Sequence, residues 1–279
     1  MDILKVIFLG AIQGVTEFLP VSSSGHLVFL ETLFGFEAES PEMLLFDLAT
    51  HLGTLIAIVV VFWKSLPGLT AHEGAVTAGG AGLNEPLKPV QKGRLLLMVL
   101  AATVATGVVV MPLKKQFTEV RGNLGVVALM WVITGVLLWI TDRRKQGRLD
   151  LQDFGLQGAL VVGLAQGAAV MPGISRSGAT IGVAILLGLH RVRAVEFSLL
   201  IGIPAILGAS LVEILGEWEV LQSGAMPVPY LLLGGTVAAV VGVGAIRLLV
   251  RFARAAQLRY FAFYCFALAL AAIAYVLLR

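Results

Sequence analysis

The chain has 279 residues, of which 58% are apolar and 13% are charged. An ordinary soluble domain has about 45–50% apolar and about 25% charged residues, so this composition excludes that class and indicates a protein of the lipid bilayer. The net charge of +3 is small, and the lysines and arginines are scattered along the chain, so no nucleic-acid partner is expected. The single cysteine, Cys265, excludes a disulfide framework and a cysteine-based zinc site.

The first apolar run, from Ile3 to Leu19, stops at Pro20 and a serine cluster before a second short run continues to Phe36. Irregular backbone at membrane depth is tolerated only inside protein or beside a wet cavity. The interruption therefore predicts a re-entrant hairpin over residues 2–36, with a functional site at its break. A cleaved signal peptide is the alternative, but the run lacks a basic n-region and a small-residue cleavage site.

Apolar runs long enough to cross about 30 Å of hydrocarbon follow the first hairpin and a second interrupted run. The first of them carries Asp47 and His51 on one helical face, where they either bind an ion or, as we favour, satisfy each other. The expected elements are spans near 43–63, 95–113 and 122–141, a second re-entrant hairpin at 154–189, and spans near 196–214, 228–248 and 259–278.

The two interrupted runs resemble each other. A shift of 153 residues without gaps matches eight of the 26 positions from Gly10 to Gly35 with those from Gly163 to Gly188. The matches include the glutamines Gln13 and Gln166 and the serines at both breaks. Each half then has a hairpin and three spans, and because three is odd the second half is inverted. We expect one membrane domain, 1–279, with repeats at 1–150 and 151–279.

The distribution of positive charge fixes the expected orientation. Six spans place fourteen of the twenty Lys and Arg residues on one side and five on the other, with Arg176 inside the second hairpin. Positive loops face the cytoplasm. Both termini are therefore predicted outside, and the Gly-rich loop at 64–93 is predicted to be cytoplasmic.

The chemistry-bearing residues cluster at the two breaks. A helix that starts at each serine cluster offers unpaired N–H groups, hydroxyls and a positive dipole end, which together form a phosphate cup. Arg176 adds a bidentate fork and needs an anionic partner in the membrane, either Glu17 or a ligand phosphate; a structural ion pair between the hairpins is its alternative role. Gln13 and Glu17 share a helical face. The expected phosphate-binding residues are Gln13, Ser22, Ser24, Gly25, Ser175, Ser177, Gly178 and Thr180.

His26 and Ser23 are the candidates for acid–base and nucleophilic chemistry. Imidazole is suited to moving protons near neutral pH, whereas a hydrogen-bonded core histidine is the simpler interpretation. The serines are also candidates for helix capping, which we favour for Ser22 or Ser24. For Ser23 the two roles are equally supported.

The motifs Gln13…Glu17, Ser22–His26 and Pro172–Thr180 resemble those of the bacterial undecaprenyl-diphosphate phosphatases, the bacitracin-resistance family. The similarity covers essentially the whole chain, including the Phe46–Gly53 segment. It implies a multi-pass inner-membrane enzyme that releases phosphate from undecaprenyl diphosphate and so recycles the carrier for peptidoglycan synthesis. It also implies an active site facing the periplasm and a divalent cation, Mg²⁺ or Ca²⁺. The family has Glu or Gln at position 13, so Gln here argues against a mechanism that needs two carboxylates there.

The expected mechanism uses the Ser23 hydroxyl as nucleophile and His26, three residues later, as general base. Glu17 either orients His26 or holds the cation, and Arg176 neutralises the phosphate charge. Direct attack by water activated by Glu17 or His26 is the competing version. A homodimer is an open option, because the sequence does not fix the oligomeric state.

Two other functions compete with the phosphatase. Inverted repeats with broken helices are a transporter design, so a carrier or flippase for a phosphorylated lipid is the principal rival. A type-2 phosphatidic acid phosphatase shares the fragment Ser24-Gly25-His26, but its other motifs are missing from this chain.

Overall fold

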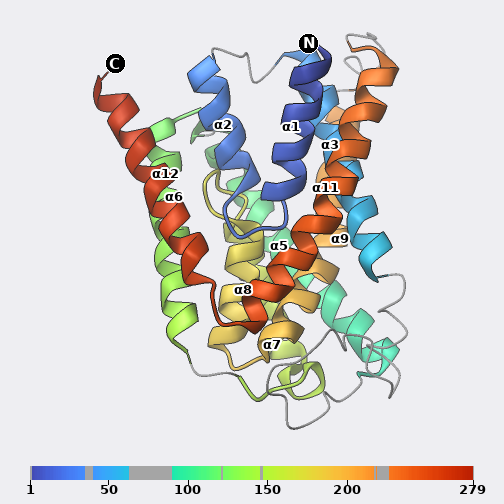
Figure 1. Ribbon diagram of the computed structural model, residues 1–279. Helices are drawn as coiled ribbons and strands as arrows, with labels where there is room; N and C mark the ends of the chain where they lie inside the picture. Colours follow the sequence, from blue (N-terminus) through green and yellow to red (C-terminus); the bar gives the residue numbers. More distant parts are fainter. Residues whose placement is uncertain are drawn as a thin grey trace.

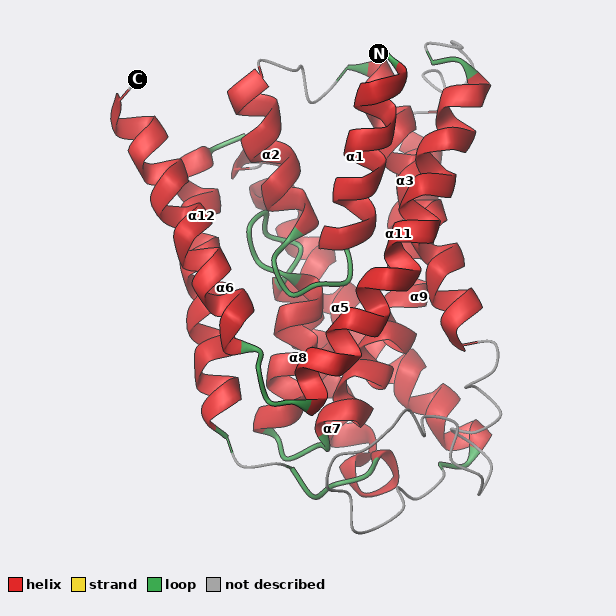
Figure 2. Ribbon diagram, in the orientation of Figure 1, coloured by secondary structure: helices red, strands yellow, loops and turns green. Residues whose placement is uncertain are grey.

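A computed structural model describes residues 2–34, 40–62, 90–120, 122–144, 147–216, 218 and 226–278. Within these ranges the chain is almost entirely helical, and Figure 2 shows helices joined by short loops. Most of the predicted loop at 64–93, and residues 35 and 36 of the first predicted hairpin, lie outside the described residues.

Within the described part of the chain, six helices are long and apolar enough to cross a membrane, which confirms the expected all-α, multi-pass fold. They are α3 (Pro41–Phe62), α5 (Lys92–Val120), α6 (Leu124–Arg143), α9 (Arg191–Gly216), α11 (Val228–Arg254) and α12 (Arg259–Leu278). Each overlaps one predicted span. The main difference is α5, which continues seven residues beyond the predicted end at 113 and passes through Pro112. Proline is tolerated in a membrane helix where neighbouring groups replace the lost hydrogen bond, and a helix does not have to end where its apolar run does.

The remaining four helices of the described ranges form two hairpins. The first consists of α1 (Ile3–Thr16) and α2 (Ser23–Phe34), and the second of α7 (Leu151–Ala168) and α8 (Arg176–Leu186). Figure 1 shows them entering the bundle from opposite ends and turning back near its middle. The second hairpin starts at Leu151 rather than at 154, and α7 is kinked at Gly155, which adopts the left-handed φ of 62°.

Close helix packing relates the two halves. Gly10 and Gly14 of α1 press on α11, and an added Cβ would lie 2.8 Å from the Gly234 carbonyl oxygen and 2.6 Å from that of Ala238. The residues 153 positions later, Gly163 and Gly167, press in the same way on α5, the helix that corresponds to α11. An inverted repeat would produce such a correspondence; the repeat and its boundaries at 150 and 151 stay predictions.

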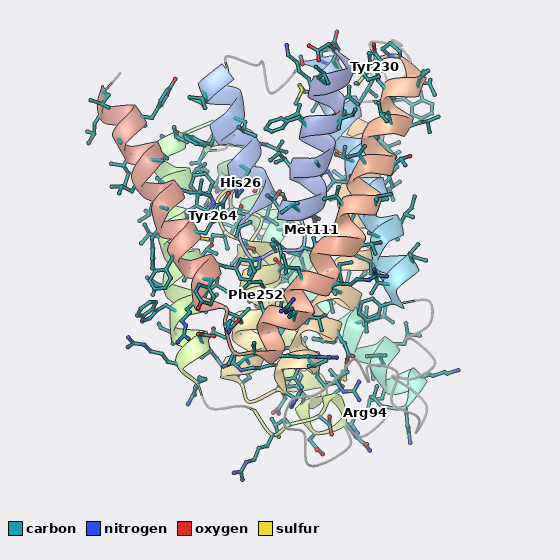
Figure 3. The ribbon with its side chains drawn as sticks, in the orientation of Figure 1. His26, Arg94, Met111, Tyr230, Phe252 and Tyr264 are labelled. Atoms are coloured by element: carbon teal, nitrogen blue, oxygen red, sulfur yellow. The ribbon has the colours of Figure 1, made fainter. Side chains whose placement is uncertain are left out.

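The hairpins meet inside one continuous core. Phe18, Leu19 and Val21 of the first break are buried in the same apolar cluster as Trp131 of α6 and Ala262 of α12. The start of α1 and the end of α12 lie at one end of the molecule in Figure 1, as the sequence predicts for the two termini. At the other end, where Arg94 lies in Figure 3, α6 finishes at Arg143 and α11 at Arg254.

Candidate active site

The first break is a tight turn that is fixed by its neighbours. Glu17 to Val21 leave the helix, Ser22 adopts a left-handed φ of 69°, and α2 starts at Ser23. The Ser22 hydroxyl accepts the Gly25 N–H at 3.2 Å, so it caps α2. The indole N–H of Trp131 donates to the Val21 carbonyl at 3.0 Å and holds the turn against α6.

The second break is built in the same way. The chain leaves α7, turns at Gly173, whose φ is 94°, and restarts as α8 behind Ser175. The Ser175 hydroxyl accepts the Gly178 N–H at 3.0 Å, which matches the cap at Ser22. Thr134 of α6 donates its hydroxyl to the Gly173 carbonyl at 3.1 Å and accepts the Ser175 N–H at 3.1 Å. One helix, α6, therefore fixes both breaks.

The two breaks touch, as predicted. The Ser177 hydroxyl donates to the Leu19 carbonyl at 3.2 Å. An Arg176 guanidinium nitrogen lies 2.7 Å from Glu17 Oε1, in a partly buried ion pair between the hairpins. A guanidinium at membrane depth costs roughly 3 kcal/mol or more, so this carboxylate is the anionic partner that the position requires.

Glu17 is the centre of the site. Its second carboxylate oxygen, Oε2, accepts the Ser23 hydroxyl at 2.9 Å and the Gln13 amide at 3.1 Å, which confirms the shared face of Gln13 and Glu17. The Glu17 side chain is only 8% exposed. Ser23 is partly exposed and Ser24 exposed, so the hydroxyl beside Glu17 remains accessible to a ligand. One carboxylate, one hydroxyl and one guanidinium thus converge at the meeting point of the breaks.

The structure shows no hydrogen bond between the described side chains of His26 and Ser23, so the expected pair of nucleophile and base stays a prediction. His26 Nδ1 lies 2.7 Å from the Ser22 carbonyl oxygen, and its Nε2 lies 2.9 Å from the hydroxyl of Tyr264 on α12. Both ring nitrogens are therefore engaged away from Ser23. The serine instead donates to Glu17, which lies at the end of the neighbouring helix across the break rather than one turn along α2.

The other predicted phosphate-binding side chains serve mostly to build the cups. Ser22 and Ser175 cap their helices, and their hydroxyls lie 3.3 Å and 3.1 Å from those of Ser24 and Ser177. The Thr180 hydroxyl contacts that of Ser198 on α9 and donates to the Arg176 carbonyl at 2.9 Å. Because the Gly25 and Gly178 N–H groups are used by the caps, the N–H groups left for an anion belong to the first residues of α2 and α8.

Two residues of the site were not identified from the sequence. The first is His51 of α3, which the sequence pairs with Asp47. Its Nδ1–H donates to the Asp47 backbone carbonyl at 2.8 Å. Its Nε2 lies 3.9 Å from Glu17 Oε2. Gly202 of α9 lies directly against the Arg176 guanidinium, which occupies the space that a Cβ would fill. Neither contact has a local sequence signal, because both depend on how distant helices pack.

The site does not fit a divalent cation held by the protein alone. Among the described residues no group of three or more His, Cys, Asp or Glu side chains is arranged around a common point. Glu17 is the predicted ligand, but both of its oxygens are engaged and Arg176 lies beside it. The Gln13 amide oxygen is buried and has no hydrogen-bond partner in the part of the chain that the structure describes. Gln13, Glu17 and Ser23 supply three oxygen-bearing side chains, fewer than the six or more oxygens that Mg²⁺ or Ca²⁺ takes.

The sequence of the chain is similar to a known family over nearly all of its length. Residues 6–271 match the family described as bacitracin resistance protein BacA. A relative from Desulfosudis oleivorans is 39% identical over 270 residues, covering 96% of each chain. A relative from Desulfatibacillum aliphaticivorans is 40% identical over 272 residues, covering 95% of each chain. A relative from Methanosphaera stadtmanae is 37% identical over 271 residues, again covering 95% of each chain. All three are named undecaprenyl-diphosphatase.

Proposed function

We propose that this chain, which belongs to the bacitracin resistance protein BacA family, hydrolyses undecaprenyl diphosphate to undecaprenyl phosphate and inorganic phosphate. Such an enzyme recycles the lipid carrier of cell-wall synthesis and thereby confers resistance to bacitracin. The observation that carries the proposal is the Ser23–Glu17–Arg176 cluster, in which a hydroxyl, a base and a cation meet at the two breaks. A cluster of this kind matches the needs of phosphoryl transfer, which are an aligned nucleophile and neutralisation of charge.

The Ser23 hydroxyl is the nucleophile of the proposed reaction, and Glu17 is its general base. Glu17 Oε2 is 2.9 Å from Ser23 Oγ and takes the proton as Oγ bonds to the terminal phosphorus. The bond from phosphorus to the bridging oxygen breaks, and its electrons leave with undecaprenyl phosphate. Glu17 then passes this proton to the departing undecaprenyl phosphate or to solvent and is ionised again. In the second half, Glu17 takes a proton from a water molecule as the water oxygen bonds to the phosphorus of the phosphoserine. The bond from phosphorus to Ser23 Oγ breaks, Glu17 returns the proton to Oγ, and inorganic phosphate leaves.

Arg176 and the two helix starts bind the transferred phosphate. The guanidinium is 17% exposed beside Glu17, so its remaining N–H groups can turn to an incoming phosphate oxygen. The first N–H groups of α2 and α8 add donors and the positive ends of two helix dipoles. Gly202 leaves room for the guanidinium, and the caps at Ser22 and Ser175 keep the helix starts in place.

A divalent cation enters this proposal together with the substrate. Since the side chains offer too few ligands, a diphosphate that already binds Mg²⁺ or Ca²⁺ would bring most of them. Calorimetry of the protein with Mg²⁺ alone should therefore detect no tight site, while EDTA should slow the release of phosphate. Tight binding of Mg²⁺ without diphosphate would contradict this arrangement.

The proposed location is the bacterial inner membrane, with both termini and the opening of the site on the periplasmic side. The positions of Arg94 in Figure 3, of Arg143 at the end of α6 and of Arg254 at the end of α11, all opposite to the termini, support this orientation. A reporter fused after Arg279 should be active in the periplasm. A cytoplasmic reading would refute the orientation.

Release of phosphate by the purified chain in detergent tests the proposed function. Undecaprenyl diphosphate labelled in its terminal phosphate should yield free phosphate and, after rapid quenching, labelled Ser23. Ser23→Ala should abolish both signals. The matched control is Thr32→Ala, which removes another hydroxyl of α2, one that donates to the Val28 carbonyl. An anionic-lipid carrier, which the converging broken helices also suit, would bind the lipid but release no phosphate in detergent.

A further inference from the structure

The proposed reaction leaves one polar pair beside the site unused. The Tyr264 hydroxyl of α12 lies 2.9 Å from His26 Nε2. The two rings are stacked, with their centroids 5.7 Å apart and an interplanar angle of 11°. Figure 3 shows both side chains in the space between α2 and α12. The positions are 238 residues apart in the sequence. A specific tyrosine–histidine contact between two helices of a membrane protein calls for a role.

The direction of the hydrogen bonds follows from the Ser22 carbonyl. That oxygen can only accept, so His26 Nδ1 carries a hydrogen and neutral His26 accepts from Tyr264 at Nε2. If His26 gains a proton, Nε2–H donates to the Tyr264 oxygen instead, and the phenol O–H becomes free to donate elsewhere. The pair can thus present a hydrogen-bond donor together with a positive charge.

The pair lies between the catalytic cluster and the lipid-facing surface. His26 is three residues after Ser23, so the two side chains are neighbours on one face of α2. His26 is 6% exposed, whereas Tyr264 is 46% exposed. In a diphosphate the two phosphoryl groups share one oxygen. With the terminal group at Ser23 and Arg176, the group that carries the lipid must lie next to it, on the way to the surface.

We infer that His26 and Tyr264 form a second subsite, which binds the lipid-attached phosphate of the substrate; this inference rests on the proposed function. The group keeps its negative charge throughout the reaction and favours protonated His26, which frees the Tyr264 O–H to donate to a phosphate oxygen. The other described groups around the His26 ring are the Trp131 indole of α6 and the Ser22 carbonyl. Neither is charged, so the lipid phosphate is the counter-ion.

Product inhibition separates the two subsites. Inorganic phosphate mimics the transferred group, whereas a polyprenyl phosphate carries the lipid-attached group. Tyr264→Phe keeps the stacked ring and removes one donor to a charged group, so the KM for polyprenyl diphosphate and the inhibition constant of polyprenyl phosphate should rise roughly tenfold. The inhibition constant of inorganic phosphate and kcat should change less than about twofold. Tyr275→Phe is the matched control, because its hydroxyl also joins α12 to α2, at the Thr32 carbonyl.

Each other result overturns the subsite. If both inhibition constants rise equally, or if neither rises, Tyr264 does not distinguish the two phosphates. A fall in kcat alone would make it a positioning residue for chemistry. A direct measurement of polyprenyl phosphate binding to the wild-type protein and to Tyr264→Phe distinguishes a failure of the subsite from a failure of the proposed function. Binding that depends on Tyr264 without any phosphatase activity refutes the proposed function, and phosphatase activity with binding independent of Tyr264 refutes the subsite.

Discussion

Glu17→Gln tests whether Glu17 or His26 is the base that activates Ser23. Glu17 Oε2 accepts the Ser23 hydroxyl at 2.9 Å, whereas the His26 nitrogens are taken by the Ser22 carbonyl and the Tyr264 hydroxyl. Glutamine has nearly the same shape, and its amide oxygen can still accept from Arg176. It cannot take a proton. The substitution therefore removes the base and the negative charge while the side chain keeps nearly the same shape.

The expected loss lies in kcat. A positioned general base contributes about 10²- to 10⁴-fold, so the barrier should rise by about 2.7 to 5.4 kcal/mol. The KM should not rise, because removal of the Glu17 charge relieves repulsion with the diphosphate and releases Arg176 from its 2.7 Å ion pair. A fall in kcat with an unchanged or lower KM distinguishes loss of a base from loss of a binding contact.

Single-turnover assays with labelled terminal phosphate measure this effect on the first step. Formation of the phosphoserine should slow in Glu17→Gln and disappear in Ser23→Ala. The double variant should be no worse than Ser23→Ala, because residues that act as a unit are not additive. His26→Asn combined with Glu17→Gln should multiply the two losses. The opposite pattern would show that His26 is the base. In that pattern, His26→Asn adds no further loss of rate to Ser23→Ala, while the loss from Glu17→Gln multiplies the losses from both other variants.

Two further substitutions test the site, and a third tests His190, which directly precedes α9. Arg176→Lys should lower kcat/KM about 10- to 100-fold in the phosphate-release assay, because an ammonium cannot replace the fork; near-normal turnover would contradict this. Gly202→Val should cause a similar loss by displacing the guanidinium, while Gly208→Val on the same helix, where a Cβ meets open space, should not. Burial, opposed by Asp150 and reinforced by nearby arginines, lowers the pKa of His190 from 6.5. As the pH is lowered, His190 therefore gains its proton more readily in the unfolded chain than in the folded one. The thermal midpoint in detergent should fall as the pH is lowered from about 7.5 to about 5.5. His190→Asn keeps an acceptor for the Val192 N–H and should flatten that slope.

The spans and breaks could be predicted because their causes are local. An uncharged run of about 20 residues must become a helix in lipid, since only a helix satisfies its own backbone there. The serine at each break caps the next helix by contacting an N–H three residues later, as Ser175 does with Gly178. Gln13 and Glu17 meet because they are four residues apart on one helix. The α5 continuation past Pro112 was missed, because charge marks the end of an apolar run and not the end of a helix.

The partners of the site residues could not be predicted, because they come from other helices. His26 is three residues from Ser23 in the sequence, yet Glu17 reaches the serine because the break turns back on itself. His51 comes within 3.9 Å of Glu17 only through the packing of α3 beside the first hairpin. Spacing along one chain segment is thus a guide to a cap or a shared face. It is a poor guide to which of two nearby groups receives a proton.

The ion pair between the hairpins links proton transfer to charge stabilisation in the proposed reaction. While Glu17 is ionised, it neutralises Arg176 and makes a buried guanidinium tolerable at this depth. When Glu17 takes the Ser23 proton it loses its charge, and the full positive charge of Arg176 is left for the phosphate oxygens. The guanidinium therefore binds the transition state more strongly than the ground state, which is the condition for lowering the barrier. Because one partner comes from each hairpin, neither break could provide this effect alone.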